Sequence, residues 1–217
     1  MNFDRIVQLS YLAQYTSLLD KLRVNSKTHV LDVGSGFGFL KKLVTNKEGR
    51  YVGIESDSNT INSAITLYGC DGFIYGFFPD AVPIAEYDVI VALTVLDEVP
   101  DKAKFLEGIK ARLHPKHGIC YLAVRNRTFF INHFKTSNTM AARSARAKMY
   151  SQDLTSTEWE SLLTTAGFEI CDFGKFYRPW FTGFNFFGLI NLSYKLISMI
   201  IPRRYSYMLF YLIRIKK

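Results

Sequence analysis

Residues 29–40 constrain the fold of this 217-residue chain more than any other stretch. They open with an apolar run, Val30, Leu31 and Val33, which predicts a short strand buried on both faces of a parallel sheet. Three glycines on alternate positions and a helical apolar repeat follow, so the segment predicts a strand, a glycine turn and a helix. Glycine can adopt positive φ and lets a ligand approach the backbone closely. The free N–H groups at the helix start suit a carboxylate or a phosphate.

The spacing of the glycines separates two kinds of ligand. A dinucleotide fingerprint reads G-x-G-x-x-G, and its third glycine would fall at Phe39. The chain instead reads D-x-G-x-G-x-G from Asp32 to Gly38, which argues against NAD and FAD. An ordinary tight turn could also carry these glycines. The pattern resembles motif I of the class I S-adenosylmethionine (SAM) dependent methyltransferases, in which the loop wraps the methionine part of SAM.

Two further segments are similar to the same family. Tyr51–Glu55 reads as a strand ending in an acid, about twenty residues after the glycines, where a ribose-binding carboxylate is expected. Residues 87–101 are similar to the family's fourth strand and the turn after it. The resemblance runs from about residue 28 to 125 and implies an enzyme that uses SAM as its cofactor.

Strand and helix patterns alternate along the first half of the chain, which predicts right-handed crossovers and a parallel sheet covered on both faces. The expected strands are 28–33, 50–55, 71–76, 87–93 and 118–125, and the expected helices are 37–46, 57–68 and 101–113. A capping box, Thr155-x-x-Glu158, starts a later helix, and Phe168 begins a sixth strand. Residues 205–215 resemble the family's last strand, which lies antiparallel between the fifth and sixth. The predicted fold class is α/β, with a doubly wound, mostly parallel, seven-stranded Rossmann-like sheet in a single domain, 1–217.

The resemblance assigns the SAM contacts to the carboxyl ends of the strands, where ligands of such sheets bind. It makes Asp32 an organiser of the loop and of the SAM amino end, and Glu55 the acceptor for both ribose hydroxyls. Many family members carry an acid after the third strand that takes the adenine amino group, but residues 76–78 are Gly-Phe-Phe, so adenine should pack on apolar groups and backbone. The full set expected to bind SAM is Asp32, Gly34, Ser35, Gly36, Gly38, Glu55, Ser56, Gly76, Phe77, Ala92 and Leu93.

Catalysis of methyl transfer depends largely on holding acceptor and sulfonium in line. A hydroxyl acceptor also needs a general base. Three of the four histidines, His29, His114 and His117, fall at the far side of the predicted sheet, which leaves His133 as the first candidate base. Glu98, at a position where family members often show histidine, is the second. The three cysteines share no metal-ligand spacing, so no metal site is predicted.

The chain's positive charge is concentrated at one end. Residues 1–172 hold nineteen acidic and nineteen basic residues, whereas residues 173–217 hold eight basic residues and no acid. The same end carries thirteen of the thirty-three aromatic residues, which indicates an anionic surface, either a membrane or a nucleic acid. The odd cysteine count and the absence of a secretory pattern predict reduced core thiols in a cytoplasmic protein.

Two segments fall outside the family pattern. Residues 126–152 interleave basic and aromatic residues and are expected to cover the acceptor, although a solvated basic helix is an alternative. Residues 178–204 are apolar and basic, and we expect them to lie in a membrane interface without spanning it. A buried helix or a homodimer contact is the competing interpretation.

The predicted function is transfer of the SAM methyl group to an acceptor at or near a membrane, such as a lipid, a quinone or a lipid-linked glycan. A soluble small-molecule O- or N-methyltransferase and an RNA methyltransferase remain as alternatives. Nucleic acid is the weaker choice because the fourth strand ends Ala-Leu-Thr-Val at residues 92–95, without the Asn/Asp-Pro-Pro-Tyr/Phe motif of base-amino methylation. No feature of the sequence favours the remaining alternative, a protein that binds SAM without catalysing methyl transfer.

Overall fold

The structure is a computed structural model, and it describes residues 22–128, 154–176 and 208–217. The apolar spacing of residues 3–22 also predicts an amphipathic helix. Nearly all of that helix, the predicted base His133, nearly all of the insert 126–152 and the whole segment 178–204 lie outside the described residues. None of the helices in the described ranges is long and apolar enough to cross a bilayer.

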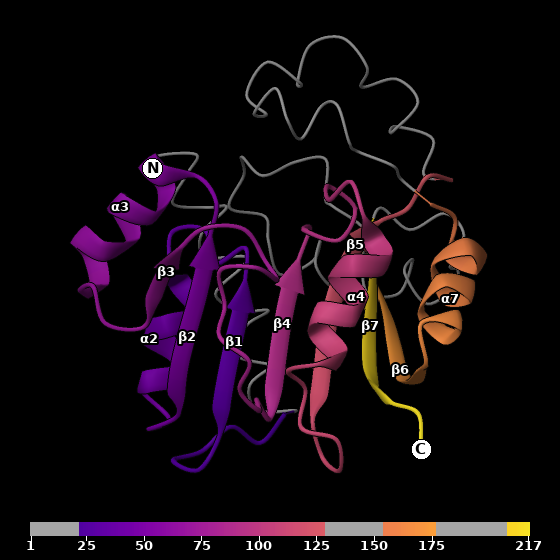
Figure 1. The fold of residues 1–217 in the computed structure, drawn as a ribbon, viewed down its shortest axis with the longest axis horizontal. Helices are drawn as coiled ribbons and strands as arrows, with labels where there is room; N and C mark the ends of the chain where they lie inside the picture. The colour runs from indigo at the N-terminus through magenta and orange to yellow at the C-terminus, as the bar shows by residue number, and fades with distance from the viewer. Residues whose placement is uncertain (1–21, 129–153, 177–207) are drawn as a thin grey trace, which may run out of the picture.

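The core of the fold is one seven-stranded sheet with the strand order β3-β2-β1-β4-β5-β7-β6 (Figure 1). The strands are β1 (His29–Val33), β2 (Arg50–Glu55), β3 (Phe73–Tyr75), β4 (Val89–Leu93), β5 (Ile119–Arg125), β6 (Phe168–Phe176) and β7 (Met208–Ile215). The first five are parallel, and β7 lies antiparallel between β5 and β6. The predicted sheet, including the place of its last strand, is confirmed.

The described helices are α2 (Phe39–Thr45), α3 (Ser58–Tyr68), α4 (Lys102–Lys110) and α7 (Ser156–Thr165). Neighbouring residues of β1 point to opposite faces of the sheet, so Val30 and Leu31 belong to different buried clusters. Leu31 packs in the cluster of Phe105 from α4 and Trp159 from α7, whereas Val30 packs with Leu40 from α2. Both faces of the sheet are therefore covered, as the continuous apolar strands require.

The capping box predicted for α7 is present. The backbone N–H of Thr155 donates to the carboxylate of Glu158 at 2.7 Å, and the backbone N–H of Glu158 donates to the Thr155 hydroxyl at 3.3 Å. Arg127, two residues after β5, donates to both carboxylate oxygens of Glu158 at 2.9 Å. The start of α7 is thus tied to the carboxyl end of the parallel sheet.

Three sequence expectations need correction. The third strand is shorter than predicted because Gly72 and Gly76, with φ of 78° and 151°, break the extended backbone on either side of it. The fourth strand starts at Val89, and Tyr87 forms only an isolated bridge to Leu113. The cysteines were expected to be core thiols, but only Cys120 is buried; Cys70 and Cys171 are exposed. Cys171 lies at the register shift of β6 against β7, between Ile170 and Asp172.

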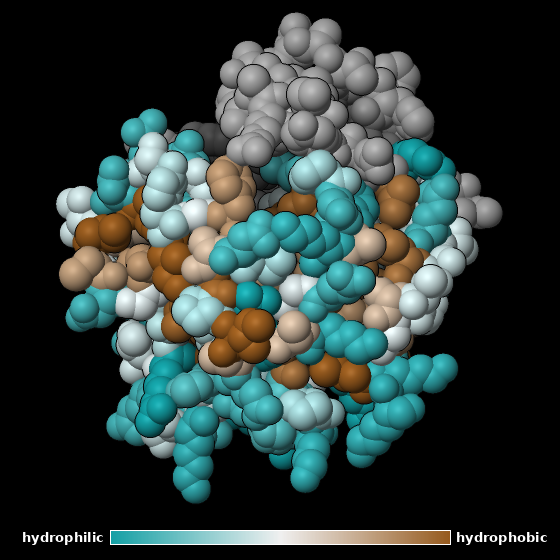
Figure 2. All heavy atoms as spheres, in the orientation of Figure 1, coloured by the Kyte–Doolittle hydropathy of each residue, from teal (hydrophilic) through white to brown (hydrophobic). Residues whose placement is uncertain are grey.

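The amino ends of the parallel strands carry a hydrophilic surface. Figure 2 shows hydrophilic side chains gathered over the end where the parallel strands begin. His114 and His117 stack there at 3.5 Å between ring centroids, and His117 pairs with Asp88 at 2.6 Å. These histidines therefore lie away from the carboxyl ends of the strands, where the glycine turn is found.

Candidate active site

The carboxyl ends of the parallel strands form a rim around the glycine turn. β1 lies between β2 and β4, so the chain leaves β1 toward one edge of the sheet and later returns on its other side. Such a reversal of strand order opens a crevice at the carboxyl ends. Gly34 follows β1, Gly76 follows β3, and Glu55 and Leu93 close β2 and β4. The sequence placed these four positions on one rim, and the structure brings them there.

The three glycines of the turn have different physical roles. All have positive φ, between 54° and 75°. At Gly34 a Cβ would collide with the side chain of Val95, and at Gly38 it would lie 2.5 Å from the ring of Phe73. A Cβ at Gly36 would meet nothing within 4 Å. Gly34 and Gly38 are therefore needed for packing, whereas Gly36 leaves space open to a ligand.

Glu55 joins the end of β2 to the glycine turn. Its carboxylate accepts hydrogen bonds from the backbone N–H of Gly36 at 3.0 Å, Ser56 at 2.7 Å and Asp57 at 2.9 Å. These bonds orient the side chain toward the turn. A carboxylate oxygen has two lone pairs, so Glu55 retains acceptor capacity for hydroxyl groups.

Asp32 lies behind the turn, inside the sheet. Its side chain is buried and accepts a hydrogen bond from the Tyr51 hydroxyl at 2.9 Å. Burial raises the pKa of Asp32 from its ordinary value of 3.8 to about 7; the Tyr51 hydrogen bond opposes this rise, and the nearby Glu55 charge adds to it. Tyr51 is a partner that the sequence reading missed, although it stands at the start of the segment that ends in Glu55.

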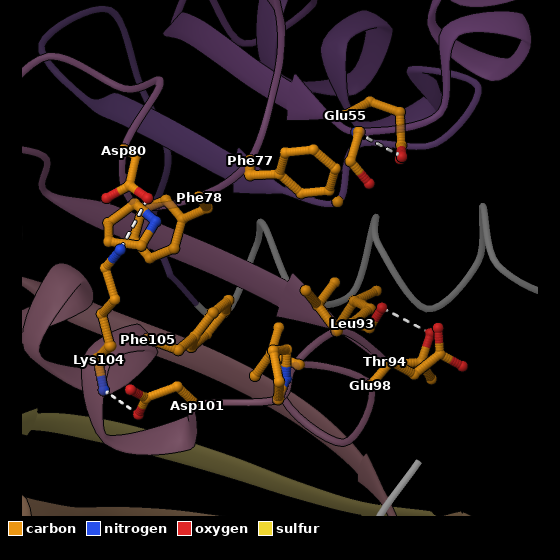
Figure 3. A pocket seen from close by; sticks show the side chains of 16 residues that line it. Glu55, Phe77, Phe78, Asp80, Leu93, Thr94, Glu98, Asp101, Lys104 and Phe105 are labelled. Carbon is orange, nitrogen blue, oxygen red and sulfur yellow. Dashed lines mark hydrogen bonds and ion pairs between the residues drawn. The ribbon is translucent and has the colours of Figure 1, made fainter. Parts of the chain in front are cut away.

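A cavity of about 550 Å³ opens at the rim (Figure 3). Six of the residues predicted from the sequence line it: Gly34, Glu55, Ser56, Phe77, Leu93 and Glu98. Six others predicted to bind SAM do not line it: Asp32, Ser35, Gly36, Gly38, Gly76 and Ala92. The cavity extends further along the β3–β4 loop and the start of α4, through Phe78, Pro79, Asp80, Asp101, Lys104 and Phe105. This extension was not predicted, because nothing in the local sequence links the loop to α4.

The wall beyond β3 is aromatic. Phe77 is half-exposed, and Figure 3 shows its ring between Glu55 and Phe78. Phe78 packs edge-on against Phe105 of α4 with ring centroids 5.0 Å apart. Arg112 holds the following turn by donating to the backbone oxygens of Pro79 at 2.9 Å and Val82 at 2.5 Å. The loop is thus fixed from the far end of α4, and its aromatic side chains fit the apolar contact expected for adenine.

The turn after β4 contains a strained residue. Thr94 has φ of 58°, in the left-handed region that a β-branched residue rarely adopts. Its N–H donates to the Ala123 oxygen of β5 at 2.8 Å, and its hydroxyl donates to the Leu93 oxygen at 2.6 Å. Strain of this kind gathers at functional sites. Thr94 lines the cavity beside Leu93.

Three charged side chains meet next to that turn. Asp97 pairs with the Nε of Arg125 at 2.5 Å, and Glu98 lies 3.4 Å from an Nη1 of the same guanidinium. Of the three, Glu98 alone lines the cavity. The sequence reading singled out Glu98 and missed its two companions. The available signal was Arg125 itself, a cation at the end of a buried apolar strand, which requires an acidic partner.

The residues present fit SAM. The space next to Gly36 is open and any side chain at that position would fill it, and the Glu55 carboxylate lies beside it. The buried Ser35 hydroxyl has no hydrogen-bond partner among the described residues, but it does not line the cavity, so it gives no support to a SAM contact. Within the same ranges, no three His, Cys, Asp or Glu side chains gather as metal ligands.

Comparison with known proteins decides the family. Residues 24–167 match the family described as methyltransferase domain. The chain belongs to that family. The strand order and the similarity to SAM-dependent relatives place this methyltransferase in class I of the SAM-dependent enzymes.

Two curated relatives are similar in sequence. A SAM-dependent methyltransferase of Mycolicibacterium smegmatis is 26% identical over 144 residues, which cover 66% of this chain and 52% of that protein. The match therefore spans about half the length of that relative. The ubiquinone biosynthesis O-methyltransferase of Rhizobium etli is 25% identical over 178 residues, which cover 78% of this chain and 71% of that protein.

Among solved structures, a chain in the complex of the Haloferax volcanii Trm112 methyltransferase activator with a methyltransferase has the same fold. The TM-score is 0.68 at 16% identity, and the match covers 99% of this chain and 95% of that chain. At such identity the similarity concerns the fold alone.

Proposed function

We propose that this methyltransferase transfers the methyl group of SAM to a hydroxyl group on an apolar acceptor, such as a quinone or a lipid, at or near a membrane surface. The observation that carries the proposal is one continuous cavity, in which part of the rim for SAM, a phenylalanine wall and the carboxylate of Glu98 face the same space. Similarity to the ubiquinone biosynthesis O-methyltransferase of Rhizobium etli supports an oxygen atom as the methyl acceptor.

The expected chemistry follows from this arrangement. SAM, the methyl donor, carries an electrophilic methyl group on a positively charged sulfur. An O–CH₃ bond forms on the acceptor, the S–CH₃ bond breaks and the sulfur keeps the electron pair. The acceptor proton passes to Glu98, or to His133 if that residue reaches the site. Aligning donor and acceptor supplies much of the rate, and a base adds about 10²–10⁴-fold.

Charge in the cavity favours this acceptor class over RNA. Among the described residues that line the cavity, four carry carboxylates, Glu55, Asp80, Glu98 and Asp101, and one carries a cation, Lys104. Lys104 is already paired with Asp80 at 2.7 Å. A negative wall attracts the sulfonium of the donor and repels phosphate groups of a nucleic acid. A neutral, apolar phenol is compatible with both the charge and the aromatic residues.

The test is methyl transfer from radiolabelled SAM into three fractions of a cell extract: lipid, aqueous small molecules and RNA. We expect label in the lipid fraction, and loss of that label with Glu55→Ala, which should bind SAM about 10-fold or more weakly. Label confined to RNA or to the aqueous fraction would overturn the proposed acceptor class, while leaving the enzyme class intact.

A further inference from the structure

The cluster of Arg125, Asp97 and Glu98 joins two strands behind the cavity. Arg125 is the last residue of β5, and the two acids follow the turn after β4. The two strands are adjacent and parallel, with Leu93 paired to Ala123, so Arg125 extends two residues past the end of β4. Its guanidinium thereby reaches under the turn that carries Glu98 into the cavity wall.

The three side chains differ in how deeply they are buried. Their exposed fractions are 0% for Asp97, 4% for Arg125 and 32% for Glu98. Charges withdrawn from water carry a large desolvation penalty, and apolar replacements of such pairs are often as stable. Stability alone therefore does not explain a buried ion pair directly behind the candidate active site.

The cluster is held from both ends. The Arg125 carbonyl accepts a hydrogen bond from the indole N–H of Trp159, a fully buried residue of α7, at 2.9 Å. In the antiparallel ladder Arg125 pairs with Met208 of β7. The Glu98 N–H donates to the Val95 oxygen at 2.8 Å, which fixes the turn. The arginine and the glutamate are thus anchored on separate elements, and their ion pair links those elements.

We propose that Arg125 is a positioning residue that holds Glu98 toward the acceptor, and that Asp97 neutralises Arg125 so that Glu98 remains the reactive carboxylate. The two distances support this division of roles. At 2.5 Å Asp97 is the close partner, whereas 3.4 Å lies beyond the usual length of an N–H···O hydrogen bond. The three side chains together carry one net negative charge, and its cavity-facing member is Glu98. This inference rests on the proposed function, because it assigns Glu98 to the acceptor proton.

A double-mutant cycle tests the inference. The variants are Arg125→Met, Glu98→Gln and their combination, with a prenylated phenol as the acceptor probe. We expect each single change to lower kcat by about 10–100-fold, with KM for SAM within about twofold. In the Glu98→Gln background, Arg125→Met should cost little more, since Arg125 acts through Glu98. Multiplicative losses would overturn the proposal and indicate a structural role.

The pH profile supplies a readout that a structural role would not change. Removing a cation beside Glu98 makes its carboxylate easier to protonate, so the acidic limb of kcat should move to higher pH in Arg125→Met. Arg125→Lys keeps the charge and should restore the wild-type limb. If Arg125→Met does not fold, Asp97→Asn replaces it in the cycle, and the acidic limb should then move to lower pH because the charge of Arg125 is no longer neutralised. An unshifted limb in every folded variant contradicts the inference.

The two proposals fail in different ways. A wild-type protein that binds SAM but methylates no phenolic or lipid acceptor contradicts the proposed function. A wild-type protein that methylates the phenol, with independent effects of Arg125 and Glu98, contradicts only the positioning role.

Discussion

At the residue scale, Gly36 allows a binding role to be separated from a folding role. Gly36→Val places a side chain in the open space of the turn, and we expect SAM affinity to fall about tenfold or more. Gly69 is the matched control, since it also has positive φ, 78°, and open space around it, but lies at the end of α3. Gly69→Val should lower the melting temperature without changing the calorimetric affinity for SAM. Equal affinity in both variants would remove the turn from the SAM site.

Asp32 gives a pH dependence of fixed sign. Its folded pKa of about 7 lies above the ordinary 3.8, so between these values the unfolded carboxyl ionises while the folded one stays protonated. The free energy of unfolding therefore falls as pH rises through this window and levels off above it. Asp32→Asn removes the group and keeps an acceptor for the Tyr51 hydroxyl. Its stability relative to wild type should increase between pH 5 and 8, by about 3 kcal/mol at most.

Urea unfolding at the two pH values measures this change. Asp57 is a useful contrast, because hydrogen bonds to Thr60 lower its pKa. A lowered pKa adds stability that is lost as pH falls. Asp57→Asn should therefore be less stable than the wild type near neutral pH, and this difference should shrink in acid. A stability difference for Asp32→Asn that does not vary with pH would contradict the raised pKa.

Thr94 stores strain that a substitution can release. Asparagine tolerates left-handed backbone better than threonine, so Thr94→Asn should raise the free energy of unfolding by about 1 kcal/mol. Glu48 also has positive φ, 61°, in the turn before β2, so Glu48→Asn should stabilise similarly. We expect only Thr94→Asn to change kcat or KM, since Thr94 lines the cavity and Glu48 does not. A destabilised Thr94→Asn protein would show that the hydroxyl bond to Leu93 outweighs the strain.

At the element scale, one lysine ties α2 to the loop between α3 and β3. The Lys41 ammonium donates to the backbone oxygens of Tyr68 at 2.8 Å, Gly69 at 3.2 Å and Asp71 at 2.6 Å. Lys41→Met leaves these oxygens without their donor and should lower the free energy of unfolding by about 1–3 kcal/mol. Lys42, exposed on the same helix, is the control, and Lys42→Met should stay within about 0.5 kcal/mol. Equal losses of unfolding free energy in Lys41→Met and Lys42→Met, measured by denaturant titration, would contradict a stabilising role for the Lys41 hydrogen bonds.

The same elements show what the sequence can and cannot predict. Apolar runs and turn residues identify β1, β2 and α7 because the information is local: buried strands are continuous in hydrophobicity, and the Thr155 box closes within one turn. The Lys41 tie and the Arg125 cluster join residues about thirty positions apart, and no local pattern reports which distant partner a charge will meet. The left-handed backbone of Thr94 likewise has no local signal, because β-branched residues rarely adopt it. The rim could therefore be predicted, whereas the residues behind it could not.

At the scale of the whole molecule, the uneven charge along the chain leads to a binding prediction. The apolar and basic residues 178–204, which carry four of the eight cations of this end, should dock the protein on anionic vesicles, and added salt should release part of it, since only the charge contribution is screened. Replacing Phe184 and Phe187 by serine should weaken cosedimentation and leave SAM affinity unchanged. Lys116 and Lys110 changed to serine provide a control outside the segment. If the wild-type protein does not cosediment with anionic vesicles at low salt, the membrane part of the proposal is contradicted.

The position of β7 also has a consequence for biosynthesis. This strand is made after every other strand of the sheet, yet it lies between two of them and supplies hydrogen bonds to both. Until residues 208–215 leave the ribosome, β5 and β6 each present an unpaired edge, and such edges invite association with other chains. The SAM rim on β1, β2 and β4 needs no contact with β7 and can assemble earlier. A nascent chain arrested before residue 208 should therefore already offer its glycine turn to SAM while it still depends on chaperones to shield its open edges.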